Sequence, residues 1–168
     1  DSFSGTPTSN SVKISGSNGT STMDNVVISN VGEIYLNNSA SLEISNAEFA
    51  NNRYGVELNN GSSVNIENVN FTGTAYESVS AYNGSSITIA SSTISNTIDA
   101  DAIGIYDSNL TISSTTINTV LDGDGIGLYN STTTISNVVI ENVSGDGIAV
   151  YGGSVSGTAT IDGVEVEF

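Results

Sequence analysis

The side chains most capable of chemistry in this sequence are carboxylates that recur at a near-constant spacing. Glu77, Asp101, Asp124 and Asp146 each precede a short apolar stretch, and Asp99 and Asp122 lie two residues before Asp101 and Asp124. Carboxylates stacked about 5 Å apart repel by roughly 1 kcal/mol in water and ~3 kcal/mol at an effective dielectric constant of 20. Because oxygen-rich sites suit Ca²⁺, these six residues are predicted calcium ligands. The alternative is that Asp-Gly pairs only form turns and water screens the charge.

The sequence offers no complete set of residues for the commonest catalytic mechanisms. It contains no Cys and no His, so a Ser-His-Asp or Cys-His arrangement would lack its base. Two carboxylates can hydrolyse a glycosidic bond without a metal, but no pair stands out among the many outward-facing acids. We therefore predict that the protein is not an enzyme, and we assign no catalytic residue.

A second set of candidate positions consists of sequons for N-glycosylation. The motif Asn-x-Ser/Thr begins at Asn18, Asn37, Asn60, Asn70, Asn83, Asn109, Asn130 and Asn142. Ser and Thr are so abundant that chance alone would give nearly as many sequons. Asn60, Asn83 and Asn130 carry more weight because they follow corresponding apolar stretches and would share one exposed corner. The whole set forms the predicted glycosylation sites.

The acids and sequons belong to a repeat of about two dozen residues. Successive copies include SLEISNAEFANNRYGVELNNGS, SVNIENVNFTGTAYESVSAYNGS and NLTISSTTINTVLDGDGIGLYNS. Each copy has three short stretches in which apolar and polar residues alternate, and this period of two indicates β-strands. The predicted inward pairs include Leu42 and Ile44 in the first strand, Val69 and Phe71 in the second, and Ile103 and Ile105 in the third.

The recurrence of three strands in one order determines the predicted fold. Such strands can stack only if each pairs in parallel with its counterpart one coil away. We therefore predict an all-β fold, a right-handed parallel β-helix (β-solenoid) with three short parallel sheets and about seven coils. A sandwich or an antiparallel barrel would need tight hairpin turns. The predicted domain covers residues 11–168, after an N-terminal leader segment at residues 1–10.

Turn residues align between the copies in the same way. Between the first and second strands lie Asn25, Asn46, Asn68, Ser91, Ser114 and Asn137, and after the second strand lie Asn30, Asn51, Asn96 and Asn142. Asn tolerates left-handed backbone, and stacked Asn side chains can hydrogen-bond along the axis. After the third strand come Tyr82, Tyr106, Tyr129 and Tyr151, which are predicted to stack as a structural column.

This repeat resembles the pectate-lyase-like superfamily of parallel β-helices, and GDGIGLYNSTTTISNVVIENVSGDGIAVYGG is similar to its generic unit. The resemblance covers nearly the whole chain and implies the fold. Members include polysaccharide lyases and hydrolases, phage tailspikes, adhesins and surface-layer proteins, so the function is not implied. The lyases need a basic residue beside calcium-binding acids, but Lys13 lies in the first partial coil and Arg53 in a turn without an acid cluster. The hydrolases carry a His and a basic motif that this chain lacks, which leaves a non-catalytic, extracellular type.

Length and charge narrow the partners of the protein. The 168 residues fit one domain, and the formal net charge is −16 with only Lys13 and Arg53 as cations. Such a surface repels nucleic acid and anionic lipid. No apolar run approaches the ~20 residues of a membrane span. We expect no nucleic-acid partner and no membrane insertion, and we place the protein outside the cell or at the cell surface.

The two ends of the solenoid suggest self-assembly. The chain begins with a third strand at Val12 and Ile14 and ends with a second strand at Val164 and Val166, followed by Phe168. No amphipathic helical cap is evident, so both ends would expose strand edges and core. These five residues are the predicted assembly interface of a head-to-tail homopolymer, and the predicted function is that of a structural subunit of an extracellular filament or fibre.

Other functions remain open on the same pattern. One alternative is a module of a larger surface adhesin, and another is a carbohydrate-binding or polysaccharide-degrading β-helix with glycans as partners. In a further alternative, residues 1–10 and a loop at residues 152–157 fold over the ends as caps.

Overall fold

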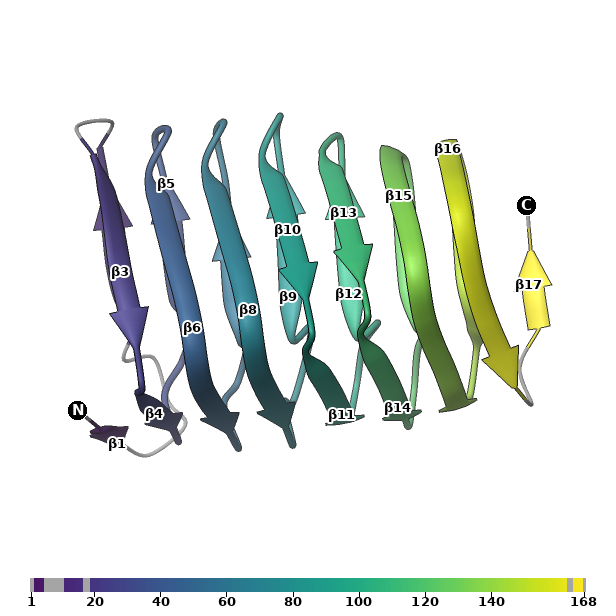
Figure 1. The fold of residues 1–168 in the computed structure, drawn as a ribbon, viewed down its shortest axis with the longest axis horizontal. Coiled ribbons are helices and arrows are strands. Elements are labelled where there is room, and N and C mark those ends of the chain that lie inside the picture. The colour runs from purple at the N-terminus through teal and green to yellow at the C-terminus, as the bar shows by residue number, and fades with distance from the viewer. Residues whose placement is uncertain (1, 5–10, 17–18, 163–164, 168) are drawn as a thin grey trace.

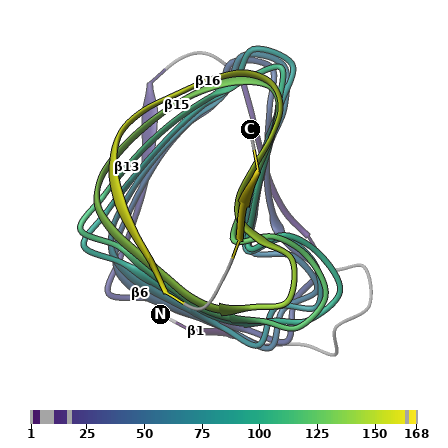
Figure 2. The same cartoon turned by 90° about the vertical axis from the view of Figure 1, so that its right-hand side faces the viewer.

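A computed structural model describes residues 2–4, 11–16, 19–162 and 165–167. Short strands in these residues wind into coils that lie side by side along one long axis (Figure 1). Viewed along that axis, the coils superpose closely (Figure 2). Every strand pairing is parallel, and hydrogen-bonded partners lie 21 to 24 residues apart in sequence. The predicted all-β solenoid is therefore confirmed.

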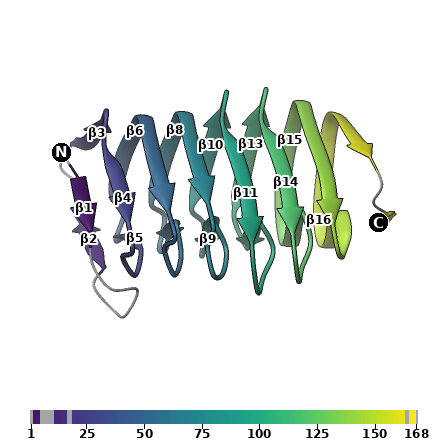
Figure 3. The same ribbon diagram turned by 90° about the horizontal axis from the view of Figure 1, so that it is seen from below.

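The strands form three parallel sheets that recur once per coil (Figure 3). Strands confined to the first sheet are β3 (Thr20–Asp24), β10 (Ser86–Ala90) and β13 (Asn109–Ser113). Strands confined to the second are β1 (Ser2–Ser4), β4 (Val27–Ser29), β11 (Thr93–Thr97) and β14 (Thr116–Val120). Strands confined to the third are β2 (Val12–Ser15), β5 (Ile34–Asn37), β7 (Val56–Leu58), β9 (Val79–Tyr82), β12 (Ile103–Tyr106) and β17 (Glu165–Glu167).

Four longer strands run through the corners between sheets. β6 (Ser41–Ala50) and β8 (Ser63–Thr72) join the first and second sheets, and β15 (Ile126–Val143) and β16 (Asp146–Asp162) contribute to all three. Within the described residues, the first sheet has a strand in seven successive coils: β3, β6, β8, β10, β13, β15 and β16. The chain thus makes about six turns between the first and last of these.

The core is the apolar column inside the three sheets. The predicted inward residues are buried, and Phe49 and Phe71 stack with ring centroids 4.6 Å apart. Their outward neighbours, such as Glu43, Asn65 and Thr88, are exposed. Because residues of one type recur one coil apart, each coil covers the apolar face of the next, and the core is continuous along the axis.

Residues in left-handed backbone turn the chain at each corner. Asn25, Asn46, Asn68, Ser91, Ser114 and Asn137 all have φ between 47° and 53° or 54° between the first and second sheets. Asn is favoured there because its short polar side chain tolerates this conformation and can bond locally. The Nδ2 atom of Asn68 donates to Oδ1 of Asn46 at 2.7 Å, so the predicted amide ladder is confirmed at this corner.

The structure corrects the predicted order of strands at the ends. β1 pairs with β4 in the second sheet, so the solenoid already includes Ser2–Ser4 ahead of residue 11. β17 pairs with β16 at Asp146–Ala149, which places it in the third sheet and not in the second. The error arose at residues 152–157, which we expected to be a loop. They form a first-sheet strand in β16, where Gly153 and Gly157 have φ of 106° and 111° and lie against β15.

Candidate functional site: the carboxylate and tyrosine columns

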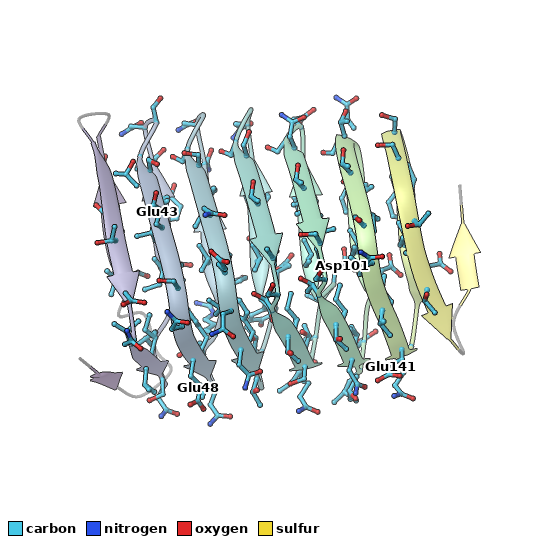
Figure 4. All side chains as sticks on the ribbon, in the orientation of Figure 1. Glu43, Glu48, Asp101 and Glu141 are labelled. Atoms are coloured by element: carbon cyan, nitrogen blue, oxygen red, sulfur yellow. The ribbon has the colours of Figure 1, made fainter. Side chains whose placement is uncertain are left out.

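The predicted acidic residues divide into an ordered column and two exposed side chains. Glu77, Asp101, Asp124 and Asp146 are partly buried just before the third-sheet strand of four successive coils. Asp99 and Asp122 are exposed. Figure 4 shows Asp101 in the row of coils, whereas Glu43, Glu48 and Glu141 project from other points of the surface. We call the first four residues the carboxylate column.

Backbone amides of the next coil bind two members of the carboxylate column. Oδ1 of Asp101 accepts a hydrogen bond from the N–H of Asp124 at 2.9 Å, and Oδ1 of Asp124 accepts one from the N–H of Asp146 at 2.8 Å. Each carboxylate therefore satisfies a donor at the point where the next coil turns into its third strand. This bonding gives the column a structural role that requires no ion.

Glycine leaves room for these carboxylates on the third sheet. A Cβ atom at Gly127 would collide with Oδ2 of Asp101, and one at Gly104 would lie 3.3 Å from Cγ of Glu77. Each carboxyl group thus covers a glycine one coil further along the axis. The Gly-Ile and Gly-Leu pairs of the repeat are needed for this close approach, which sequence reasoning had not assigned to them.

Burial raises the pKa values in and beside the carboxylate column. The pKa of Asp101 rises to about 6, mainly because burial disfavours the charged form, while the hydrogen bond from Asp124 opposes the rise. Burial also raises the pKa values of Glu77 and Asp124. Glu57 lies in β7 and was not predicted as a site residue. Burial, followed by the charges of Glu33 and Glu77, raises its pKa to about 7.

Calcium binding by these acids stays a prediction. In the part of the chain that the structure describes, no three or more acidic, His or Cys side chains are grouped so as to hold a metal ion. The exposed Asp99 and Asp122 contribute no printed bond to the ladder formed by Asp101 and Asp124. The candidate ligands are therefore spread along the axis, and one carboxylate oxygen of Asp101 and of Asp124 already accepts an amide.

The predicted tyrosine column is confirmed. The ring centroids of Tyr82 and Tyr106, Tyr106 and Tyr129, and Tyr129 and Tyr151 are 4.7, 4.5 and 4.8 Å apart. The corresponding interplanar angles are 5°, 6° and 15°. This separation matches the ~4.8 Å between neighbouring strands, so the rings follow directly from the parallel register. The hydroxyl of Tyr129 donates to Oδ2 of Asp101 at 3.4 Å, which joins the tyrosine and carboxylate columns.

A second aromatic stack was missed in the sequence. The rings of Tyr54 and Tyr76 stack with centroids 5.0 Å apart, and the Arg53 guanidinium carbon lies 5.5 and 5.6 Å from the two centroids. One of the chain's two cations is therefore held in a cation–π contact. The signal was present, because Tyr54 and Tyr76 precede corresponding third strands by two or three residues.

The sequons lie at exposed or partly exposed positions, apart from Asn18, which is outside the described residues. Asn37 is partly exposed, and Asn60, Asn70, Asn83, Asn109, Asn130 and Asn142 are exposed. Several amides already bond along the axis: Nδ2 of Asn60 donates to Asn37, of Asn83 to Asn59, of Asn130 to Asp107 and of Asn142 to Asn118. Asn109 and Asn130 also line a polar hollow of about 200 Å³ with Asp107, Ser108 and Thr132. Glycosylation at these positions stays a prediction.

The predicted assembly residues are only partly described. Val12 and Ile14 lie in β2 and pack, partly buried, against the core. Val166 lies in β17, whereas Val164 and Phe168 are outside the described residues. Because β17 belongs to the third sheet, it occupies the same sheet as β2. Among the residues that can be described, no helix is long and apolar enough to span a bilayer.

Comparison with known families agrees with this architecture. Residues 32–167 match the family described as the right handed beta helix region. The chain belongs to the right-handed β-helix family. This confirms the predicted winding as well as the parallel β-helix fold. A comparison with curated proteins gave no significant match. As a right-handed β-helix, the protein presents a rigid surface on which bonds between coils account for both the carboxylate and the tyrosine columns.

Proposed function

We propose that this right-handed β-helix is a non-catalytic structural protein of the extracellular space or cell surface, and that copies stack head to tail into a filament. The observation that supports stacking is the position of the outermost third-sheet strands. Within the described residues, β2 pairs only with β5, and β17 pairs only with β16. Each therefore presents one unpaired strand edge, and the two edges face opposite ends of the axis (Figure 1).

The second sheet offers a similar pair of edges. β1 lies beyond β4 at one end, and the second-sheet part of β16, Ala159–Asp162, lies beyond β15 at the other. A second copy could therefore extend two sheets in parallel register, with β2 on β17 and β1 on Ala159–Asp162. Such a contact is heterologous and does not close on itself, which is the geometry of a filament.

Stacking predicts that a charge on the inward face of β2 blocks assembly. Ile14 packs against the end of the core, so Ile14→Lys would place an ammonium group where the next coil must sit. Ser15 is the adjacent exposed residue, and Ser15→Lys adds the same charge without entering the core. We expect fibres of the unmodified protein and of Ser15→Lys by negative-stain electron microscopy, and mainly monomers of Ile14→Lys.

Circular dichroism of each variant would show that the β-structure is kept. Light scattering at rising protein concentration gives a second measure of assembly. A protein that stays monomeric over the whole concentration range, before any substitution, would contradict the proposed function.

A further inference from the structure

The tyrosine column holds phenol rings in an arrangement suited to covalent coupling. Tyr106 and Tyr129 stack at 4.5 Å between centroids with an interplanar angle of 6°, and both are partly exposed. They occupy paired positions in β12 and β15, so the parallel register places equivalent ring atoms opposite one another. Tyr82 continues the stack on one side and Tyr151 on the other. The ring carbons next to the two hydroxyl groups are therefore neighbours in the folded chain.

A carboxylate accompanies each of the two central phenols. Asp101 accepts the hydrogen bond from the hydroxyl of Tyr129 at 3.4 Å, and Glu77 has a side-chain hydrogen bond to Tyr106. Burial and these nearby negative charges raise the pKa values of Tyr106 and Tyr129, so neither phenol loses its proton to solvent near neutral pH. Removal of an electron makes a phenol strongly acidic, and a carboxylate already bonded to the hydroxyl can take that proton.

We propose that Tyr106 and Tyr129 form a site of oxidative modification, at which a one-electron oxidant of the haem peroxidase class, using hydrogen peroxide, couples them into dityrosine. Each phenol loses one electron to the oxidant and one proton, from Tyr106 to Glu77 and from Tyr129 to Asp101. The two phenoxyl radicals join through a carbon–carbon bond between ring positions adjacent to the oxygens. The two ring hydrogens at that bond then move through water to the oxygens, which restores both phenols.

The reaction balances as two phenols and one hydrogen peroxide giving one dityrosine and two water molecules. The product links two coils covalently within one chain. Because a radical can pass between stacked rings, oxidation at any ring of the column can lead to coupling within it. Tyr35, in β5, and the Tyr54–Tyr76 pair, with its larger interplanar angle of 21°, lie outside the column and provide internal comparisons.

The test treats the full chain with horseradish peroxidase and hydrogen peroxide. We expect dityrosine fluorescence, a monomeric mass reduced by two hydrogen atoms, and a cross-linked peptide pair that contains Tyr106 and Tyr129. In the double variant Tyr106→Phe/Tyr151→Phe, the remaining Tyr82 and Tyr129 no longer have a tyrosine neighbour in the column, so the fluorescence yield should fall at least severalfold. Phe keeps the ring stack, which preserves the fold.

The matched control is Tyr35→Phe/Tyr54→Phe, which removes the same number of tyrosines outside the column and should keep the full yield. Asp101→Asn retains an oxygen for the N–H of Asp124 but is a much weaker proton acceptor, so it should slow coupling severalfold, whereas the exposed Asp99→Asn should not. Cross-links that join separate chains, or equal yields in the two double variants, would overturn the proposal. An unchanged rate in Asp101→Asn would overturn the proton-acceptor step.

Discussion

Thr133 has a buried hydroxyl group without a hydrogen-bond partner in the described residues. The equivalent inward position holds Val64, Ile87 and Leu110 in the three preceding coils. A buried donor left without a partner costs roughly 1–3 kcal/mol. We predict that Thr133→Val raises the free energy of unfolding by about 1 kcal/mol, because a methyl group replaces the unpaired hydroxyl.

Thermal unfolding would show this gain as a rise in Tm of about 2–4 °C for a chain of this size. The control is Thr134→Val at the adjacent outward position, where a surface change should stay within about 0.5 kcal/mol. A fall in Tm for Thr133→Val would indicate that the hydroxyl has a partner, such as a buried water molecule.

Sequence patterns identified which residues face inward but not how individual polar side chains in the core are satisfied. Asn52 is buried, and its side chain accepts from the N–H of Val31 and donates to the carbonyl of Ile28, both at 3.0 Å. Those partners lie in the preceding coil. No local pattern distinguishes Asn52 from the exposed Asn51, because the difference arises from where the stacked backbone ends up.

At the scale of the element, the carboxylate column makes stability depend on pH. The folded pKa values of about 7 for Glu57 and about 6 for Asp101 exceed the ordinary values of 4.5 and 3.8. The folded chain therefore binds more protons than the unfolded chain between roughly pH 4 and pH 7, and its free energy of unfolding falls as pH rises through that range. Asp24, whose hydrogen bonds with Ser45 and Asn46 lower its pKa, has the opposite effect only at more acid pH.

We predict a higher Tm near about pH 5 than near about pH 8 in a fixed salt concentration. Glu57→Gln removes a half-buried charge, so it should raise the Tm at the higher pH and reduce the slope of Tm against pH. Glu43→Gln, at an exposed position in β6, removes the same charge and should leave most of the slope. A Tm that rises steadily from the acid to the alkaline side would contradict the prediction.

The calcium prediction can be tested on the same column. If Ca²⁺ offsets the repulsion between Glu77, Asp101, Asp124 and Asp146, a chelator lowers the Tm and added calcium restores it. Added magnesium at equal ionic strength controls for general screening. A Tm that is identical with chelator and with calcium would leave the backbone hydrogen bonds of Asp101 and Asp124 as the whole role of these acids.

Over the whole molecule, the parallel solenoid followed from the sequence because three independent patterns agreed. The alternating apolar residues, the left-handed Asn corners and the tyrosine column all recur at one period, and each was confirmed. The assignment failed where residues 152–157 lack apolar side chains, since a glycine-rich strand gives no alternation to detect. The bonding of Asp101 could not be foreseen either, because its amide partner comes from a different coil.

The parallel pairing also determines how the molecule would respond to force. Its backbone hydrogen bonds between coils run along the long axis, so a pull on the two ends loads them in tension and not in shear. The terminal coil bears this load first, because each coil is held mainly by its immediate neighbours. It would detach alone and release the 21 to 24 residues that separate neighbouring coils. The protein would then lengthen in small, nearly equal steps, as a brake that yields one coil at a time.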